Sequence, residues 1–153
     1  MTIVVPKAEL ANYIGKEMEP GEWFTIDQDR VNQFADVTVD HQFIHLDEEA
    51  AKKTPFGGTI AHGFLTLSLL THLASKSSLV PKEILMGVNY GFEKVRFINP
   101  VRVGSEVRAL VTIADVTEKN AGQYLIKQAI SIEIKGQDKP ALVCEWLIMM
   151  ACS

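Results

Sequence analysis

The feature that most constrains the fold is a change in hydrophobic period near residue 84. Residues 63–74 contain no acidic or basic side chain except one histidine, and their apolar residues fall on nearly every side of a helix. From residue 84 onward, apolar and polar residues alternate, as is typical of strands. Since the apolar run is too short to cross a bilayer, we expect a central helix, buried on all sides, followed by strands that wrap around it.

Four segments carry the strand pattern. They are residues 87–97, 106–116, 124–135 and 141–150. The last is apolar on both faces apart from Glu145, which indicates a strand covered on both sides. Glycine-containing turns separate the last three segments and favour antiparallel pairing. With no internal repeat or linker, the sequence predicts one α+β domain over residues 1–153.

The sequence of the first half of the chain predicts mainly short helices and loops. We expect a helix over residues 8–14, a strand over 22–26 and a helical stretch over 47–53. Between them, Asp27 is the expected N-cap of a helix that runs to about Ala35. Val31 and either Phe34 or Ala35 should form the buried face of that helix.

Composition and charge exclude several classes of partner. The formal charge of −4, with no basic cluster, gives no reason to expect nucleic acid or an anionic membrane as partner. The N-terminus lacks the pattern of a signal peptide, and no apolar stretch reaches membrane-spanning length. Cys144 and Cys152 show neither disulfide nor metal-ligand spacing, so we expect a cytoplasmic protein.

Residues 40–47, DHQFIHLD, concentrate titratable groups and allow three interpretations. Asp40, His41, His45 and Asp47 could hold zinc or iron, but the two histidines share a face only in a helix. Residues 43–44 instead suggest an extended stretch that dips into the core. The segment could also be a polar loop that caps a helix near Asp47. Finally, Asp40 and His45 could form a water-activating pair.

A second motif, IAHG at residues 60–63, favours the last interpretation. It precedes the apolar helix, whose N-terminal N–H groups can stabilise a developing oxyanion. Gly63 would let a substrate carbonyl approach the backbone, although a packing role for this glycine is an equal alternative. The other candidate pocket residues are Gln42, Phe56, Ile60, Ala61, His62, Phe64 and Thr71.

Together the two motifs resemble those of the MaoC-like dehydratase family, which includes (R)-specific enoyl-CoA hydratases and the nodulation protein N-like group. The family pattern D-x-N-P-[IL]-H followed by A-H-G appears here as Asp40 to His45 and Ala61 to Gly63. The resemblance extends from about Trp23 to the C-terminus. Two departures stand out: residues 42–43 are Gln-Phe in place of Asn-Pro, as in the nodulation protein N-like branch, and Thr71 stands where hydratases often have serine.

This resemblance implies a hot-dog fold, in which an antiparallel sheet wraps a long central helix, and a homodimer or higher homo-oligomer. It also implies an acyl thioester substrate, carried by CoA or a carrier protein, with no metal or organic cofactor. Asp40 and His45 would activate water, and the Gly63 N–H would bind the thioester oxygen. The implied reaction interconverts a trans-2-enoyl thioester and its (R)-3-hydroxyacyl form.

Two alternatives share the same fold. Hot-dog thioesterases commonly place a carboxylate on the central helix, and residues 63–74 contain none. A catalytically silent acyl-thioester-binding subunit is the other alternative, but such relatives lack the Asp or the His that this chain retains at Asp40 and His45.

Overall fold

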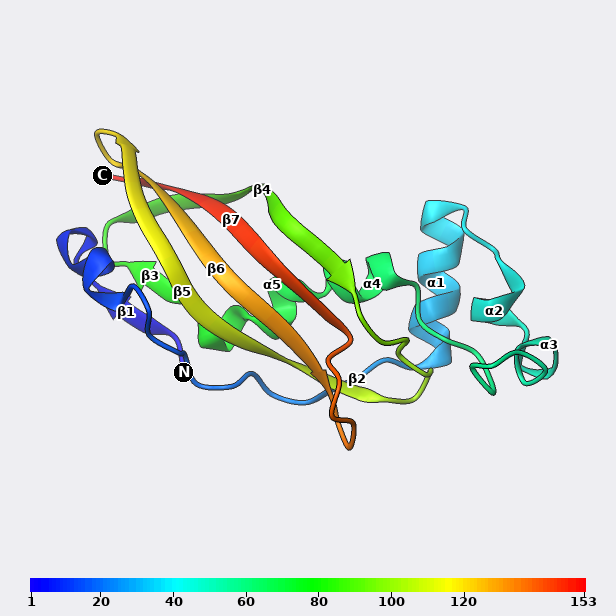
Figure 1. The fold of residues 1–153 in the computed structure, drawn as a ribbon. Helices are drawn as coiled ribbons and strands as arrows, with labels where there is room; N and C mark the ends of the chain where they lie inside the picture. The colour runs from blue at the N-terminus through cyan, green and yellow to red at the C-terminus, as the bar shows by residue number, and fades with distance from the viewer.

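A five-stranded antiparallel sheet in the order β2-β5-β6-β7-β4 forms the largest part of the structure, a computed structural model that describes all residues 1–153 (Figure 1). Its strands are β2 (Phe24–Thr25), β4 (Ile84–Phe97), β5 (Glu106–Asn120), β6 (Gln123–Ile134) and β7 (Leu142–Cys152). A second sheet pairs β1 (Ile3–Val5) in parallel with β3 (Leu79–Pro81). The four strands predicted in the second half of the chain are therefore confirmed.

The alternating pattern explains which face of the sheet is buried. Along β5, the buried residues Val107, Ala109, Val111 and Ile113 alternate with half-buried ones, and β6 shows the same alternation. β7 lies between β6 and β4, and none of its residues is exposed. The expectation that both faces of the last strand are covered is met only in part, since one face is mostly buried and the other mostly half-buried.

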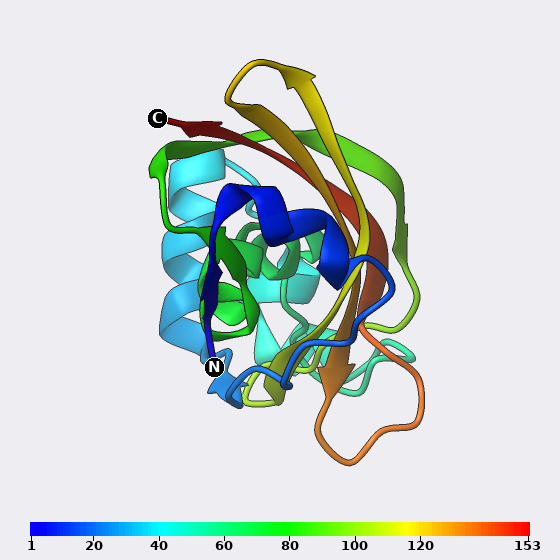
Figure 2. The same cartoon turned by 90° about the vertical axis from the view of Figure 1, so that its left-hand side faces the viewer.

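The helices are short and form two groups. α4 (Gly63–Ser68), α5 (Leu70–Leu73) and the 3-10 helix η2 (Ser75–Ser77) lie in the concave side of the curled sheet, as the end-on view shows (Figure 2). α1 (Gln28–Thr38), α2 (Phe43–Leu46) and α3 (Glu48–Ala51) lie beyond one end of the sheet (Figure 1). A further 3-10 helix, η1 (Lys7–Tyr13), confirms the predicted N-terminal helix. None of these helices is long and apolar enough to span a membrane.

The central helix differs from the prediction in two respects. It is divided at Leu69 into α4 and α5, and it is not buried on all sides. Leu65, Leu70 and Leu73 are buried against the sheet, whereas the side chain of Phe64 is 67% exposed. The apolar pattern therefore predicted the buried side of this helix but not its open side, because the sheet covers only one side of it.

Helix α1 follows its predicted start but extends further. The N–H of Arg30 donates a 2.8 Å hydrogen bond to Asp27 Oδ1, so Asp27 is the N-cap as expected. Val31 and Ala35 are fully buried. The helix continues to Thr38 and ends at Val39, which adopts the left-handed conformation with φ = 62°. This position usually favours glycine, since a β-branched side chain crowds the backbone there.

Replacing Val39 by glycine should stabilise the protein. The left-handed conformation costs a non-glycine residue about 1–2 kcal/mol, and Val39 is 79% exposed, so little packing is lost. Because glycine also gains entropy in the unfolded chain, we expect Val39→Gly to raise the free energy of unfolding by only about 0.5–1 kcal/mol in urea titrations.

Val37→Gly is the matched control, because Val37 is 78% exposed and lies inside the same helix. There glycine should lower the free energy of unfolding by about 0.5 kcal/mol through its poor helix propensity. A destabilised Val39→Gly variant would contradict the assignment of strain to Val39.

Candidate active site

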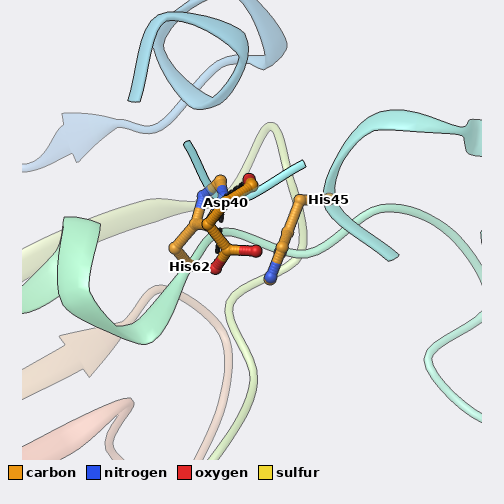
Figure 3. Close-up of side chains that lie close together, drawn as sticks. All are labelled: Asp40, His45 and His62. Carbon is orange, nitrogen blue, oxygen red and sulfur yellow. Dashed lines mark hydrogen bonds and ion pairs between the residues drawn. The ribbon is translucent and has the colours of Figure 1, made fainter. Parts of the chain in front are cut away.

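Eight of the candidate residues line one cavity of about 410 Å³ between the α1–α3 region and the N-terminus of α4. They are Asp40, His45, Phe56, Ile60, Ala61, His62, Gly63 and Phe64. Asp40, His45 and His62 meet at one side of this cavity, although they come from three different segments (Figure 3). The structure thus brings residues of the two sequence motifs together in one cavity.

His45 is held on the short helix α2, with only 7% of its surface exposed. Its Nδ1 lies 2.7 Å from the carbonyl oxygen of Ile60. Because a carbonyl only accepts hydrogen bonds, Nδ1 carries the proton, and the neutral ring has its lone pair on Nε2. Burial lowers the pKa of His45 from its ordinary value of 6.5, and neighbouring His62 acts in the same direction. His45 is therefore held neutral, with Nε2 as an acceptor.

His62 links His45 to Asp40. Its ring stacks on that of His45, with centroids 3.8 Å apart and an interplanar angle of 23°. The Nε2–H of His62 donates to the backbone carbonyl of Asp40 at 3.0 Å, and the ring of Phe34 packs at 4.9 Å. His62 is 3% exposed, and its Nδ1 has no hydrogen-bond partner in the chain. His62 is thus as buried as a core residue, but its polar and ring contacts are with other residues of the site.

Asp40 occupies a more open position than the two histidines. It follows the strained residue Val39 at the end of α1, and its side chain is 50% exposed. One carboxylate oxygen lies 3.9 Å from His62 Nε2, and the other lies 3.4 Å from the N–H of Gln42. The carboxylate thus retains free lone pairs toward solvent and the cavity, as a group that accepts a proton from water requires.

Asp40, His45 and His62 also form the one cluster that could hold a metal ion, with donor atoms within 4.8 Å of one another. This set differs from the metal interpretation of DHQFIHLD. His41 instead pairs with Asp36 at 2.9 Å, and Asp47 caps α3 by accepting from the N–H of Ala50. His45 Nδ1 and His62 Nε2 are both engaged by backbone carbonyls, so each ring could offer a metal only its other nitrogen.

Gly63 begins α4 and lies against the ring of Phe97. A Cβ atom at this position would stand 2.9 Å from that ring, so a side chain larger than hydrogen does not fit without movement of Phe97. The first hydrogen bond of the helix runs from the N–H of Leu65 to the carbonyl of His62. The N–H of Gly63 precedes that bond and has no acceptor within the helix. Both the packing and the functional interpretation of this glycine are consistent with its position.

Two candidate pocket residues lie outside the cavity, and one loop expectation is wrong. Thr71 is exposed on α5 and faces a separate depression beside Asn89 and Trp146. Gln42 is exposed at the N-cap of α2. Phe43 was expected in an extended stretch that anchors the loop, but it begins α2 and is 48% exposed.

Part of the cavity wall was missed by the sequence analysis. Thr66 contributes a buried hydroxyl without a partner, and the segments between β4 and β5 and before β7 supply the remaining wall. These additional residues are Phe97, Ile98, Asn99, Pro100, Val101, Ala141 and Leu142. The pairing of β4 with β7 brings Phe97 opposite Leu142, a contact that no local pattern encodes.

Comparisons with known proteins agree with this site and fold. The family described as MaoC like domain matches residues 9–134. Nodulation protein N of Rhizobium meliloti (strain 1021) is 43% identical over 141 residues, 92% of this chain and 88% of that protein. The 3-hydroxyacyl-thioester dehydratase Z of Mycobacterium tuberculosis is 44% identical over 141 residues, 92% of this chain and 93% of that protein.

A solved structure supports the same architecture. The (R)-hydratase from A. caviae involved in PHA biosynthesis has a TM-score of 0.71 at 24% identity, and the match covers 88% of this chain and 94% of that one. The shared curled sheet with enclosed short helices confirms the expected hot-dog fold. From the family match and its two sequence relatives it follows that the chain belongs to the MaoC-like dehydratase family.

Proposed function

We propose that the protein is a hydro-lyase that interconverts a trans-2-enoyl thioester and the (R)-3-hydroxyacyl thioester. The observation that carries this proposal is the meeting of the Asp40 carboxylate and the His45 ring at one wall of an otherwise largely apolar cavity. The relatives named as a dehydratase of 3-hydroxyacyl thioesters and as an (R)-hydratase support the substrate class and the stereochemistry.

In the hydration direction, water adds to C3 of the enoyl group. The water would donate one hydrogen bond to the Asp40 carboxylate and one to Nε2 of His45, whose lone pair is left free by the Nδ1–H bond to Ile60. As the C–O bond forms, Asp40 accepts the water proton, and the Asp40–His45 pair returns a proton to C2. The cycle adds H and OH across the double bond and leaves both residues unchanged.

The negative charge of the transition state gathers on the thioester oxygen. The N–H of Gly63 would donate to this oxygen at the start of α4, where Gly63 presents no side chain of its own to an approaching carbonyl. Phe56, Ile60, Phe64 and Phe97 provide an apolar wall for the acyl group. In these assignments, the polar side of the cavity transfers protons and the apolar side binds the acyl chain of the substrate.

Removing either member of the pair should abolish hydration without unfolding the protein. We expect Asp40→Asn and His45→Ala each to lower kcat for crotonyl-CoA by about 10²-fold or more, because each removes a general acid–base group. The loss of enoyl absorbance in the ultraviolet measures the rate. His41→Ala is the control, since His41 pairs with Asp36 at the surface and should retain wild-type turnover.

Three outcomes would replace the proposal. Near-wild-type hydration by Asp40→Asn would remove Asp40 from the mechanism. Release of free thiol from acyl-CoA would indicate a thioesterase, and binding of enoyl-CoA without hydration by the wild type would indicate a silent subunit. Loss of activity in a chelator, with recovery on adding zinc, would assign the cluster of Asp40, His45 and His62 to a metal.

The lowered pKa of His45 predicts the acid limb of the pH profile. A neutral His45 is required to accept a hydrogen bond from water, and burial disfavours its protonated form. As pH falls through the ordinary value of 6.5, His45 should remain neutral and turnover should persist, with loss only at lower pH. Fold stability should likewise begin to fall below pH 6.5, where the unfolded chain binds a proton that the folded ring resists.

Profiles of kcat/KM and NMR titration of the His45 ring test this expectation. An acid limb at or above pH 6.5 that disappears in a His45 variant would contradict it.

We also propose that β4 pairs with β4 of a second copy of the chain. β4 is an edge strand, since its only partner is β7, yet Leu85, Met86, Val88 and Tyr90 on it are at least half exposed. An exposed, apolar edge strand is normally covered. Phe97 at the end of β4 also lines the cavity and is 49% exposed, so a partner at this edge would shield the acyl site.

A charge on this strand should disrupt the dimer. We expect the wild type to sediment as a dimer and Val88→Lys to shift it to monomer, because the lysine would be desolvated at the interface. Val4→Lys is the control, since Val4 on β1 is similarly exposed at 54% but lies in the other sheet. A monomeric wild type at micromolar concentration would refute the β4 interface.

A further inference from the structure

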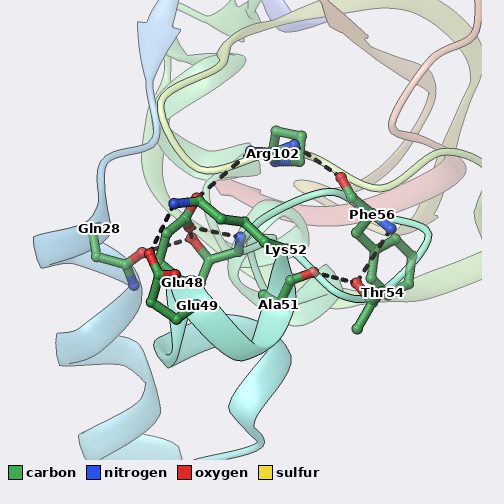
Figure 4. A network of polar contacts seen from close by, with 9 residues as sticks. Gln28, Glu48, Glu49, Ala51, Lys52, Thr54, Phe56 and Arg102 are labelled. Atoms are coloured by element: carbon green, nitrogen blue, oxygen red, sulfur yellow. Dashed lines mark hydrogen bonds and ion pairs between the residues drawn. The ribbon is translucent and has the colours of Figure 1, made fainter.

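We propose that Gln28 is a positioning residue that orients His45, an inference that rests on the function proposed above. Gln28 is the first residue of α1 and does not line the cavity. Its side-chain amide nevertheless holds the two segments that determine where the His45 ring points. Figure 4 shows this amide beside Glu48 in the polar network that includes Arg102 and Phe56.

The first contact of Gln28 is with the main chain of His45. Its Nε2–H donates a 2.8 Å hydrogen bond to the backbone carbonyl of His45, across 17 residues of sequence. This carbonyl lies in a helix of four residues, which satisfies few of its own backbone groups. The amide therefore supplies a donor where the short helix has none and attaches α2 to α1.

The second contact is with Thr59, which is 2% exposed. Gln28 Oε1 lies 2.8 Å from the Thr59 hydroxyl, and that hydroxyl also lies 2.8 Å from Glu48 Oε2. Its single proton is shared between these two acceptors. The backbone N–H of Thr59 donates to the same Glu48 oxygen at 2.9 Å. Thr59 is thus held from two sides, by Gln28 and by Glu48.

Thr59 matters because the next residue, Ile60, sets the orientation of the His45 ring. The carbonyl of Ile60 accepts from Nδ1 of His45 at 2.7 Å, and the N–H of Ile60 donates to Ile44 at 3.0 Å. One amide on α1 therefore holds both the backbone of His45 and the segment of residues 59–60, whose Ile60 carbonyl accepts the ring proton. A shift in either segment would turn the Nε2 lone pair away from the attacking water.

Helix α1 also fixes Asp40, which follows its C-terminus. Gln28 at one end of the helix and Asp40 beyond the other end place both members of the catalytic pair in one rigid frame. The core contacts of α1 come from other residues, since Val31 and Ala35 are fully buried while Gln28 is only half-buried. Loss of the amide should therefore affect the orientation of His45 more than the fold.

Gln28→Met tests the proposal, because methionine has a similar length and no hydrogen-bonding amide. We expect kcat for crotonyl-CoA to fall between about 10-fold and 10²-fold with KM within about twofold of wild type, as for a catalytic group that is misplaced rather than removed. The ring Nδ1–H signal of His45 in NMR spectra should broaden or shift, a readout that does not depend on activity.

Matched variants separate positioning from stability. Gln28→Glu keeps an acceptor for Thr59 but lacks the donor to His45, so it should be as slow as Gln28→Met. Thr59→Ser retains the hydroxyl and should be close to wild type, whereas Thr59→Val should be slow. Asn32→Ala is the control, since Asn32 makes the solvent-facing bond with the same amide at 2.9 Å and should leave kcat unchanged.

The outcomes for the two proposals can be told apart. If the wild type is active and Gln28→Met keeps both wild-type kcat and the wild-type His45 signal, the positioning role is refuted. If the wild type lacks hydratase activity, the proposed function fails, and the His45 signal alone decides whether Gln28 orients the ring. Should Gln28→Met fail to fold, Gln28→Glu and the Thr59 pair carry the same comparison.

Discussion

The hydrogen bond from His45 Nδ1 to the Ile60 carbonyl is the interaction on which the site depends. It is buried and 2.7 Å long, and together with the bond from the Ile60 N–H to the Ile44 carbonyl it joins α2 to the segment that leads into α4. The bond fixes the neutral tautomer of His45 and directs the lone pair on Nε2 away from Ile60. It also holds the segment that leads into His62 and Gly63 close to α2. His62 stacks on the same ring and donates a hydrogen bond to the carbonyl of Asp40, so the position of Asp40 is also coupled to that of His45.

Beside this site, the backbone of Val39 is strained, which lowers the stability of the fold but restricts the position of Asp40. Val39 holds a left-handed backbone directly before Asp40 although it is exposed and packs against little. A β-branched residue in this region has few accessible backbone states, so the chain that carries Asp40 is stiff as well as strained. The N–H of Asp40 bonds back to the carbonyl of Ala35, which ties the carboxylate residue to the last turn of α1. Such strain beside a functional residue can limit its movement, as the proposed role of Asp40 requires.

The sequence predicts the regular elements well, because their causes are local. Alternation along β5 and β6 and the cap at Asp27 depend on neighbours in sequence, and the structure confirms them. What the sequence did not predict lies in the tertiary arrangement. Thr71, on α5, lies outside the cavity, and the pairing of β4 with β7 brings Phe97 to its wall. The two sequence motifs supply the polar half of the site and made it predictable. The apolar half comes largely from segments that carry no recognisable sequence motif.

In a single chain, the site proposed for the reaction is open to water on one side. Hydrogen-bond donors and general bases act strongly on a thioester only where bulk water is excluded. Here Asp40 is half exposed, and the rings of Phe64 and Phe97, in edge-to-face contact at 5.9 Å, remain open beside Gly63. The uncovered face of α4 and the uncovered edge at β4 meet at these two rings. A second chain at that edge would bury both the proposed acyl-binding wall and the Gly63 N–H. The same apolar surface would then serve both dimer assembly and the proposed reaction.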